Sequence, residues 1–247
     1  MSRNFELMTQ LEIEAGITDK ATSTAANQAA RMSVVPIFSS RAGETSSEEM
    51  LRLVQRIFLS ASGSALRQVV FCGVDGESGS SSVCAMAGRT LAANSSRPVC
   101  VVDANVRSPR LSGLFGVEGE NPFCSPSAPR REQCVRIASN LWLAGPEILA
   151  DNSRVLPPPV RLKERLSELR DEFEYMLIDA PGTNACSDAQ LLGLVADAAI
   201  LVIEANSTRR HTARRAKESL EAAGVRLLGT VLHNRSFPIP ERLYNIL

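Results

Sequence analysis

Short apolar runs alternate along the chain with longer stretches in which apolar residues recur every three or four positions. The runs have the length and the polar or small flanking residues that are typical of buried strands in a parallel sheet. They cover residues 69–72, 99–102, 175–179, 198–203 and 227–232, and residues 140–145 suggest a further short strand. The stretches with helical spacing predict helices at 47–60, from 83, from the prolines at 157–159, from Ser187 and at 209–223.

This alternation predicts an α/β protein whose mainly parallel sheet is doubly wound, with helices on both faces. A chain of 247 residues is long enough for one such domain with a full core. Residues 1–45 are rich in Ser, Thr, Ala and Asn and show no sustained periodicity. We therefore expect a flexible N-terminal arm over 1–45 and a single domain over 46–247, whose first helix begins with a capping box of Ser46 and Glu49.

A loop of small residues at 73–82 follows the first strong strand and leads into a helix. Strand, glycine-rich loop and helix are the layout of a phosphate-binding loop, in which backbone N–H groups and a helix N-terminus face an anion. The usual motif, G-x-x-x-x-G-K-[ST], contains a lysine that reaches the β- and γ-phosphates. In the register that best fits the helix, Gly79 is the second glycine, Ser80 stands at the lysine position, and Ser81 stands at the hydroxyl that holds magnesium.

Two aspartates, Asp103 and Asp179, each end an apolar run. The carboxyl ends of parallel strands meet at one edge of a doubly wound sheet, where ligands bind. A nucleotide site needs a hydroxyl and a carboxylate for Mg²⁺ beside the phosphate loop. We therefore expect Asp103, Asp179 and Ser81 to form a Mg²⁺ site, although each aspartate alone would equally suit a turn or a helix cap.

The composition narrows the classes of partner. Acidic and basic residues balance at 27 each, so no overall field favours nucleic acid or an anionic membrane. The six cysteines show no paired spacing and several lie in apolar runs, which indicates reduced, buried thiols and a cytoplasmic protein. No apolar run approaches 18 residues, so we expect no membrane span and assign any membrane association to a partner.

Three stretches resemble the bacterial tyrosine kinases (BY-kinases), a deviant P-loop family related to the Mrp, MinD and partition ATPases. VVDANVRSPRLSGLFG resembles their second aspartate motif, and YMLIDAPGTNACSDAQ resembles their third. SSEEMLRLVQRIFLS is similar to the helix through which these kinases form rings. The resemblance covers about residues 45–235. It implies the P-loop fold, ATP or ADP with Mg²⁺ as cofactors, and a role in exopolysaccharide or capsule synthesis and export.

Carried onto this sequence, the resemblance implies roles for particular residues. The phosphate contacts would come from Gly76, Glu77, Ser78, Gly79, Ser80, Ser81 and Ser82. Asp103 and Asp179 would be the catalytic carboxylates and would hold Mg²⁺ with Ser81, while Asn234 would lie near the base. The contacts of a homo-oligomer would be made by Glu49, Arg52 and Arg56.

Several departures from the family motifs indicate that catalysis is lost. The loop lysine is Ser80, the second-motif carboxylate before Val106 is Asn105, and the C-terminal tyrosine cluster is reduced to Tyr244. An ammonium about 4 Å from a phosphate oxygen contributes on the order of 4 kcal/mol at an effective dielectric constant of about 20. We therefore expect a degenerate kinase-like subunit, with weakened or lost nucleotide binding. It would regulate or scaffold polysaccharide assembly together with an inner-membrane co-polymerase.

Three alternatives remain open. In the first, the chain is an active tyrosine autokinase in which an arginine, Arg107 or one from a neighbouring subunit, replaces the lysine. In the second, it is a MinD-type or partition-type ATPase. In the third, the GESGS sequence is a nucleophile elbow, with Ser78 as the nucleophile, Asp179 as the acid and His233 as the base of a serine hydrolase.

Overall fold

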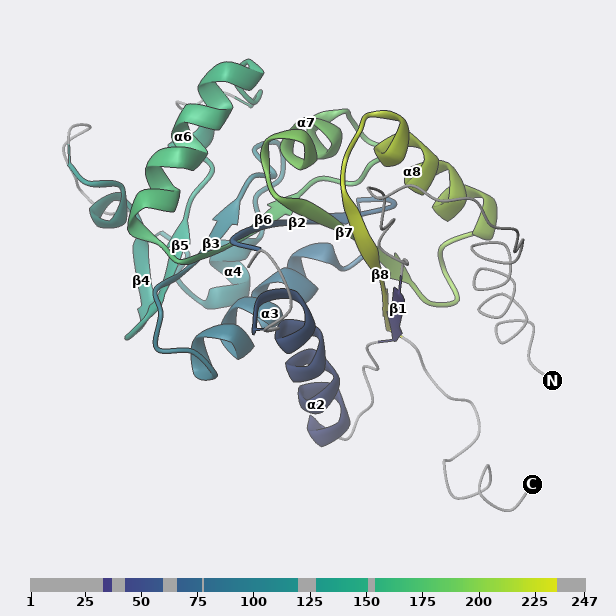
Figure 1. Cartoon of the computed structure of the whole chain (residues 1–247), viewed down its shortest axis with the longest axis horizontal. Helices are drawn as coiled ribbons and strands as arrows, with labels where there is room; N and C mark the ends of the chain where they lie inside the picture. Colours follow the sequence, from purple (N-terminus) through teal and green to yellow (C-terminus); the bar gives the residue numbers. More distant parts are fainter. Residues whose placement is uncertain are drawn as a thin grey trace, which may run out of the picture.

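A single sheet organises the protein (Figure 1). The computed structural model describes residues 33–36, 43–59, 66–76, 78–119, 128–150 and 154–234. Within these ranges, eight strands pair in the order β1-β8-β7-β2-β6-β3-β5-β4, and every neighbouring pair is parallel except β4 with β5. The strands are β1 (Ser33–Pro36), β2 (Gln68–Gly73), β3 (Val99–Asp103), β4 (Val135–Ala138), β5 (Leu141–Ala144), β6 (Tyr175–Ala180), β7 (Ala198–Glu204) and β8 (Leu227–His233).

Helices cover both faces of this sheet. Figure 1 shows α6, α7 and α8 above it and α2, α3 and α4 below it, so the predicted doubly wound α/β fold is confirmed. The helical segments are α2 (Gly43–Val54), the π-turn η1 (Gln55–Leu59), α3 (Ser80–Ala93), α4 (Leu111–Phe115), the 3-10 turn η2 (Arg130–Gln133), α5 (Glu147–Ala150), α6 (Pro159–Glu172), α7 (Asp188–Val195) and α8 (Arg210–Ala222).

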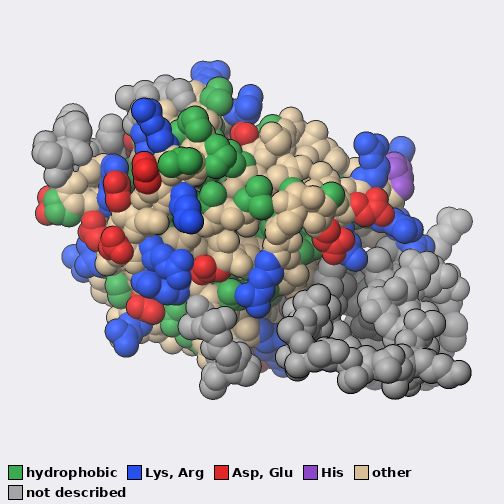
Figure 2. All heavy atoms as spheres, turned by 45° about the horizontal axis from the view of Figure 1, so that its top comes forward, with side chains coloured by type: hydrophobic (Ala, Val, Ile, Leu, Met, Phe, Trp, Pro, Cys, Tyr) green, Lys and Arg blue, Asp and Glu red, His purple; other side chains and the backbone are tan. Residues whose placement is uncertain are grey.

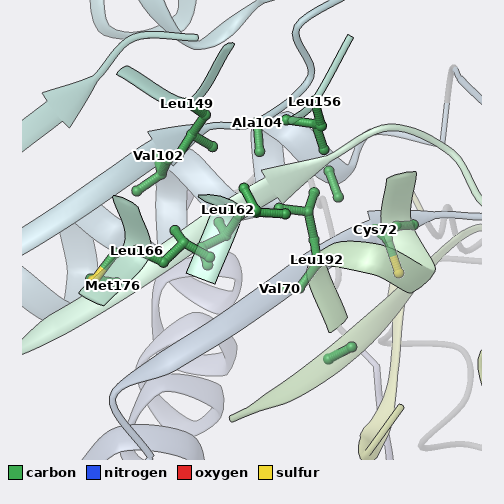
Figure 3. Close-up of a cluster of buried hydrophobic side chains, with 14 of the residues drawn as sticks. Val70, Cys72, Val102, Ala104, Leu149, Leu156, Leu162, Leu166, Met176 and Leu192 are labelled. Atoms are coloured by element: carbon green, nitrogen blue, oxygen red, sulfur yellow. The ribbon is translucent and has the colours of Figure 1, made fainter. Parts of the chain in front are cut away.

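The apolar runs are buried on both faces because side chains alternate sides along a strand. Val70 and Cys72 of β2 belong to the same buried cluster as Leu162 and Leu166 of α6 (Figure 3). Residues Val69 and Phe71 of the same strand pack under α2 and α3 in a second cluster. The central strands therefore need an uninterrupted apolar sequence, and this is why short apolar runs in the sequence predicted them.

Several boundaries differ from the expectations. Helix α2 begins at Gly43, so Ser46 lies inside the helix and the expected capping box with Glu49 is wrong. Helix α3 begins at Ser80 instead of Val83, which places the serines in its first turn. Strand β4 was not predicted, since it contributes four residues that alternate between half-buried and exposed at the edge of the sheet.

The expected N-terminal arm lies mostly outside the described residues. Residues 1–32 and 37–42 are not described, whereas Ser33–Pro36 form β1 and pair with β8. None of the helices in the described part combines the length and the apolar composition that crossing a membrane requires. On the face shown in Figure 2, Lys and Arg side chains are interspersed with Asp and Glu, in keeping with the balanced net charge.

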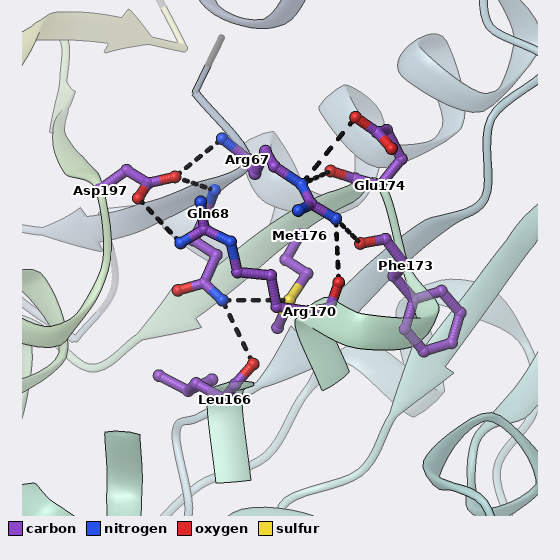
Figure 4. A network of polar contacts seen from close by, with 8 residues as sticks. All are labelled: Arg67, Gln68, Leu166, Arg170, Phe173, Glu174, Met176 and Asp197. Atoms are coloured by element: carbon purple, nitrogen blue, oxygen red, sulfur yellow. Dashed lines mark hydrogen bonds and ion pairs between the residues drawn. The ribbon is translucent and has the colours of Figure 1, made fainter. Parts of the chain in front are cut away.

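A polar network ties the amino end of β2 to α6 and to the turn before β7 (Figure 4). The Arg67 guanidinium donates to the carbonyl oxygens of Arg170, Phe173 and Glu174 at 2.9, 3.0 and 3.1 Å. The Asp197 carboxylate accepts from the backbone N–H groups of Arg67 and Gln68, both at 2.8 Å. The side chains of Arg67 and Asp197 thus provide hydrogen-bond partners for backbone carbonyl and N–H groups where these three segments meet.

We expect Arg67→Ala to lower the free energy of unfolding by about 2–3 kcal/mol, because three carbonyl groups lose their donor in a partly buried place. Urea denaturation followed by circular dichroism measures this change. Arg214→Ala is the matched control, because Arg214 is 64% exposed and pairs only with Glu218 one turn away. We expect that control to cost less than about 0.5 kcal/mol. Equal effects of the two substitutions would contradict the role assigned to the network.

Candidate functional site

The loop between β2 and α3 forms a compact turn. The Ser78 hydroxyl donates to the carbonyl oxygen of Asp75 at 2.8 Å, and the Ser78 backbone N–H donates to the same oxygen at 3.3 Å. Gly79 has a φ of 74°, in the left-handed region that favours glycine. The first hydrogen bond of α3 runs from the Val83 N–H to the Gly79 carbonyl. The preceding N–H groups of the helix therefore have no acceptor within it and are available to an anion.

The segment that follows β6 holds this loop in place. The backbone N–H groups of Thr183 and Asn184 donate to the carbonyl oxygens of Gly73 and Val74 at 2.9 and 3.2 Å. A Cβ atom on Gly182 would lie 2.7 Å from the carbonyl carbon of Asp75, so only glycine fits there. These contacts were not expected from the sequence, because the two segments are more than a hundred residues apart.

His233, at the end of β8, lies against the other side of the loop. A Cβ atom on Gly79 would lie 2.2 Å from His233 Cδ2 and 2.7 Å from Nε2. The ring is 9% exposed, its Nδ1 atom has no hydrogen-bond partner among the described residues, and burial lowers the pKa of the imidazole. The sequence suggested His233 as a strand-end residue or as the base of a serine hydrolase, and its contact with the loop was not expected.

Asp103 has a clear structural role at the carboxyl end of β3. Its Oδ2 atom accepts from the backbone N–H groups of Arg110 and Leu111, both at 3.0 Å, and its Oδ1 atom accepts from the Asn105 N–H at 3.3 Å. The carboxylate therefore caps the start of α4. Burial raises the pKa of Asp103 to about 6, against the opposing effect of these three N–H donors.

Asp179 is the most unusual group of the site. It lies directly opposite Asp103 in the register of β6 and β3. The side chain is fully buried, and neither carboxylate oxygen accepts a hydrogen bond from any described residue. Burial is the main cause that raises the pKa of Asp179 to about 8, and the charge of Asp103 adds to it. The hydroxyls of Ser81 and Ser80 lie near enough to lower this pKa without reaching good hydrogen-bond geometry.

These residues fit a divalent cation. A buried carboxylate without a partner is costly unless a cation or a proton neutralises it. Mg²⁺ prefers a few carboxylate and hydroxyl oxygens together with water and phosphate, and Asp179 with Ser81 offers such oxygens. Asp103 supplies a second carboxylate, although its oxygens already cap α4. Among the described residues no group of three or more His, Cys, Asp or Glu side chains that could hold a metal ion is present.

The other residues implied by the resemblance fall in three places. Gly76 lies on the open side of the loop, where a Cβ atom would meet nothing within 4 Å, and Glu77 lies outside the described residues. Ser80, Ser81 and Ser82 form the first turn of α3. Asn234 follows β8 at the same edge of the sheet, with a φ of 56°, and its side-chain amide donates to Glu204 at 3.3 Å.

The geometry does not support Ser78 as the nucleophile of a serine hydrolase. Its hydroxyl is 3% exposed and donates to a backbone carbonyl instead of to a histidine. A nucleophile of this kind must be exposed at the turn and hydrogen-bonded to its base.

Comparison with known proteins agrees with the resemblance. No family model matches the sequence. The chain is 29% identical to the tyrosine-protein kinase YwqD of Bacillus subtilis over 149 residues, which cover 58% of this chain and 62% of YwqD. It is 25% identical to the tyrosine-protein kinase CpsD of Streptococcus agalactiae over 141 residues, which cover 55% and 61%. The chain thus spans about three fifths of the length of these curated relatives.

Solved structures show the same fold. The kinase domain of the Escherichia coli tyrosine kinase ETK matches with a TM-score of 0.65 and 18% identity, over 79% of each chain. The chimerical protein CapA2B2 matches with a TM-score of 0.66 and 21% identity, over 83% of this chain and 95% of that one. The cell division ATPase MinD of Pyrococcus furiosus has a lower TM-score of 0.54. By sequence this chain is similar to the bacterial tyrosine kinases, and its fold is that of their kinase domains.

Proposed function

We propose that this chain is a nucleotide-binding, kinase-like P-loop protein that regulates or scaffolds polysaccharide synthesis and export, and that it does not phosphorylate tyrosine. One observation carries the proposal. A fully buried, unpaired Asp179 lies beside the first turn of α3, in which Ser80 occupies the position of the loop lysine. The carboxylate and hydroxyl for Mg²⁺ are therefore kept, while the ammonium for the transferred phosphoryl group is absent.

The chain's own groups would hold the nucleotide by backbone donors. The free N–H groups at the start of α3 would bind the phosphates, and the Ser81 hydroxyl with Asp179 would bind their metal ion. When bound, Mg²⁺ would neutralise phosphate charge and compensate the buried carboxylate of Asp179. Asp103 would keep α4 and the turn before it in position, because its oxygens accept three backbone N–H groups.

The tyrosine content also argues against autophosphorylation. The chain contains two tyrosines, Tyr175 and Tyr244. Tyr175 lies in β6 and packs edge-on against Phe58, with ring centroids 5.7 Å apart. Tyr244 lies outside the described residues. Within this sequence, few tyrosines are therefore available for autophosphorylation.

The partner would be the cytoplasmic part of an inner-membrane polysaccharide co-polymerase, as the family resemblance implies. In this proposal the chain is cytoplasmic and reaches the membrane through that partner. Its role would be to present a nucleotide-dependent surface, because a nucleotide on the loop would also act on Thr183 and Asn184, whose N–H groups donate to Gly73 and Val74.

Calorimetry with MgATP and MgADP, followed by assays for hydrolysis and phosphotyrosine, tests the proposal. We expect binding without turnover. Phosphotyrosine on the purified chain would overturn it in favour of an active kinase, and ATP hydrolysis without phosphotyrosine would favour a MinD-type ATPase. Absence of nucleotide binding would leave only a structural scaffold. Asp179→Asn is the control, since loss of the cation ligand should abolish any Mg²⁺-dependent signal.

Self-association through α2 and η1 is part of the same proposal. Arg52 is 64% exposed at its side chain and its guanidinium lies 3.0 Å from Glu49 within α2, while Arg56 follows in η1. An exposed ion pair of this kind contributes little to the folding stability of a single copy. A change in oligomer mass when the pair is removed therefore indicates contacts with a second copy. We expect Arg52→Glu to reduce the oligomer mass measured by light scattering. An unchanged mass would show that these residues form only a local ion pair.

A further inference from the structure

Two carboxyl groups meet at the carboxyl edge of the sheet without a compensating cation among the described residues. Asp103 and Asp179 lie opposite each other in register, and neither forms an ion pair with a described Lys or Arg side chain. The charge of Glu147, at the start of α5, also raises the pKa of Asp103. A bound polyphosphate would add several negative charges to this edge. Ser80 carries no charge. The positive charge that compensates the phosphates must therefore come from a side chain on another helix, strand or turn.

Arg107 was the arginine considered as a substitute for the lysine, but the structure engages it elsewhere. Its Nε atom lies 3.5 Å from an Asp188 oxygen at the start of α7. The Asp188 side chain is 11% exposed, so this ion pair is the principal compensation for a mostly buried carboxylate. Moving Arg107 to a ligand would leave Asp188 without that compensation.

Arg110 is differently placed. Its backbone N–H is fixed at 3.0 Å from the Asp103 carboxylate, one residue before α4 begins. The side chain is exposed, and no ion pair or hydrogen bond of its guanidinium is found with the described residues. The backbone of Arg110 lies beside Asp103, which is opposite Asp179 in the register of the sheet. A fixed backbone with an uncommitted guanidinium is the arrangement that a phosphate ligand can use.

We infer that Arg110 binds the terminal phosphate of the nucleotide and supplies, from the β3–α4 turn, the positive charge that the loop lacks. This inference rests on the proposed nucleotide binding. A guanidinium presents paired N–H donors to two phosphate oxygens, whereas a lysine ammonium acts as a point charge. The substitution at Ser80 is thus compensated by a residue thirty positions further along the chain.

Arg110→Gln tests the assignment, with Arg97→Gln as the matched control. Both substitutions remove one exposed arginine, but Arg97 lies at the amino end of β3 and Arg110 follows the carboxyl end. We expect Arg110→Gln to weaken MgATP binding about tenfold or more in calorimetry and MgADP binding less, while Arg97→Gln binds both like the unaltered chain. Arg110→Lys should recover part of the MgATP affinity.

The remaining outcomes separate the inference from the function on which it rests. Failure of the unaltered chain to bind any nucleotide overturns both. Equal MgATP affinities of the unaltered chain and Arg110→Gln overturn the role of Arg110 alone, as does a larger loss in Arg107→Gln. A general loss of stability would mimic weak binding, so thermal unfolding without nucleotide should be unchanged in Arg110→Gln, because the Asp103 cap uses only the backbone of Arg110.

Discussion

Ser80→Lys is expected to tighten MgATP binding by about a hundredfold. The substitution places an ammonium in the first turn of α3, where the phosphate-loop motif carries it. At about 4 Å from a phosphate oxygen, such a charge contributes on the order of 1 to 4 kcal/mol, depending on how well water screens it. Ser80 is half-buried, which favours the upper part of this range. Calorimetry on the variant and on the unaltered chain measures the difference.

The control for this gain is Ser96→Lys, which adds the same charge at an exposed turn before β3. We expect it to leave MgATP affinity unchanged. Hydrolysis should rise in Ser80→Lys only, whereas phosphotyrosine should stay low because this sequence contains two tyrosines, one of which is packed in β6. A Ser80→Lys chain that binds MgATP no better than the control would show that the loop does not hold phosphates.

Asp179→Asn is expected to stabilise the metal-free protein at alkaline pH. The pKa of Asp179 is raised from its ordinary value of 3.8 to about 8, so the folded state binds a proton that the unfolded state has released. The contribution of this proton to the free energy of unfolding is therefore lost progressively as the pH rises from about 4 to about 8. The full pKa shift corresponds to about 6 kcal/mol of unfolding free energy as an upper value. We expect the asparagine variant to be more stable than the unaltered chain by at least about 2 kcal/mol at pH 8.

Urea denaturation at pH 5, 6.5 and 8 with a chelator measures this effect as a widening difference between the two proteins. Asp171→Asn, at an exposed position of α6, should follow the unaltered chain at every pH. Addition of Mg²⁺ at pH 8 should stabilise the unaltered chain and leave Asp179→Asn unchanged, because only the former offers the carboxylate. A constant difference across the pH range would contradict the raised pKa.

The sequence by itself determined the α/β class, the main strands and the order of helices along the chain. These features follow from local pattern, since a strand buried on both faces needs a continuous apolar run. The same reasoning placed Asp103 and Asp179 at strand ends and identified the missing lysine at Ser80. Short edge elements were missed, because β4 and α5 have four residues each and too little periodicity to be distinguished.

Only the tertiary structure decided how the site is assembled. The strand order places β6 between β2 and β3, and this brings Asp179 opposite Asp103 and leaves it buried without a partner. It also brings His233 against Gly79 and commits Arg107 to Asp188 while Arg110 stays uncommitted. The physical reason is that burial, pairing and pKa depend on neighbours distant in sequence, whose positions follow from the packing of the whole sheet and not from any local pattern.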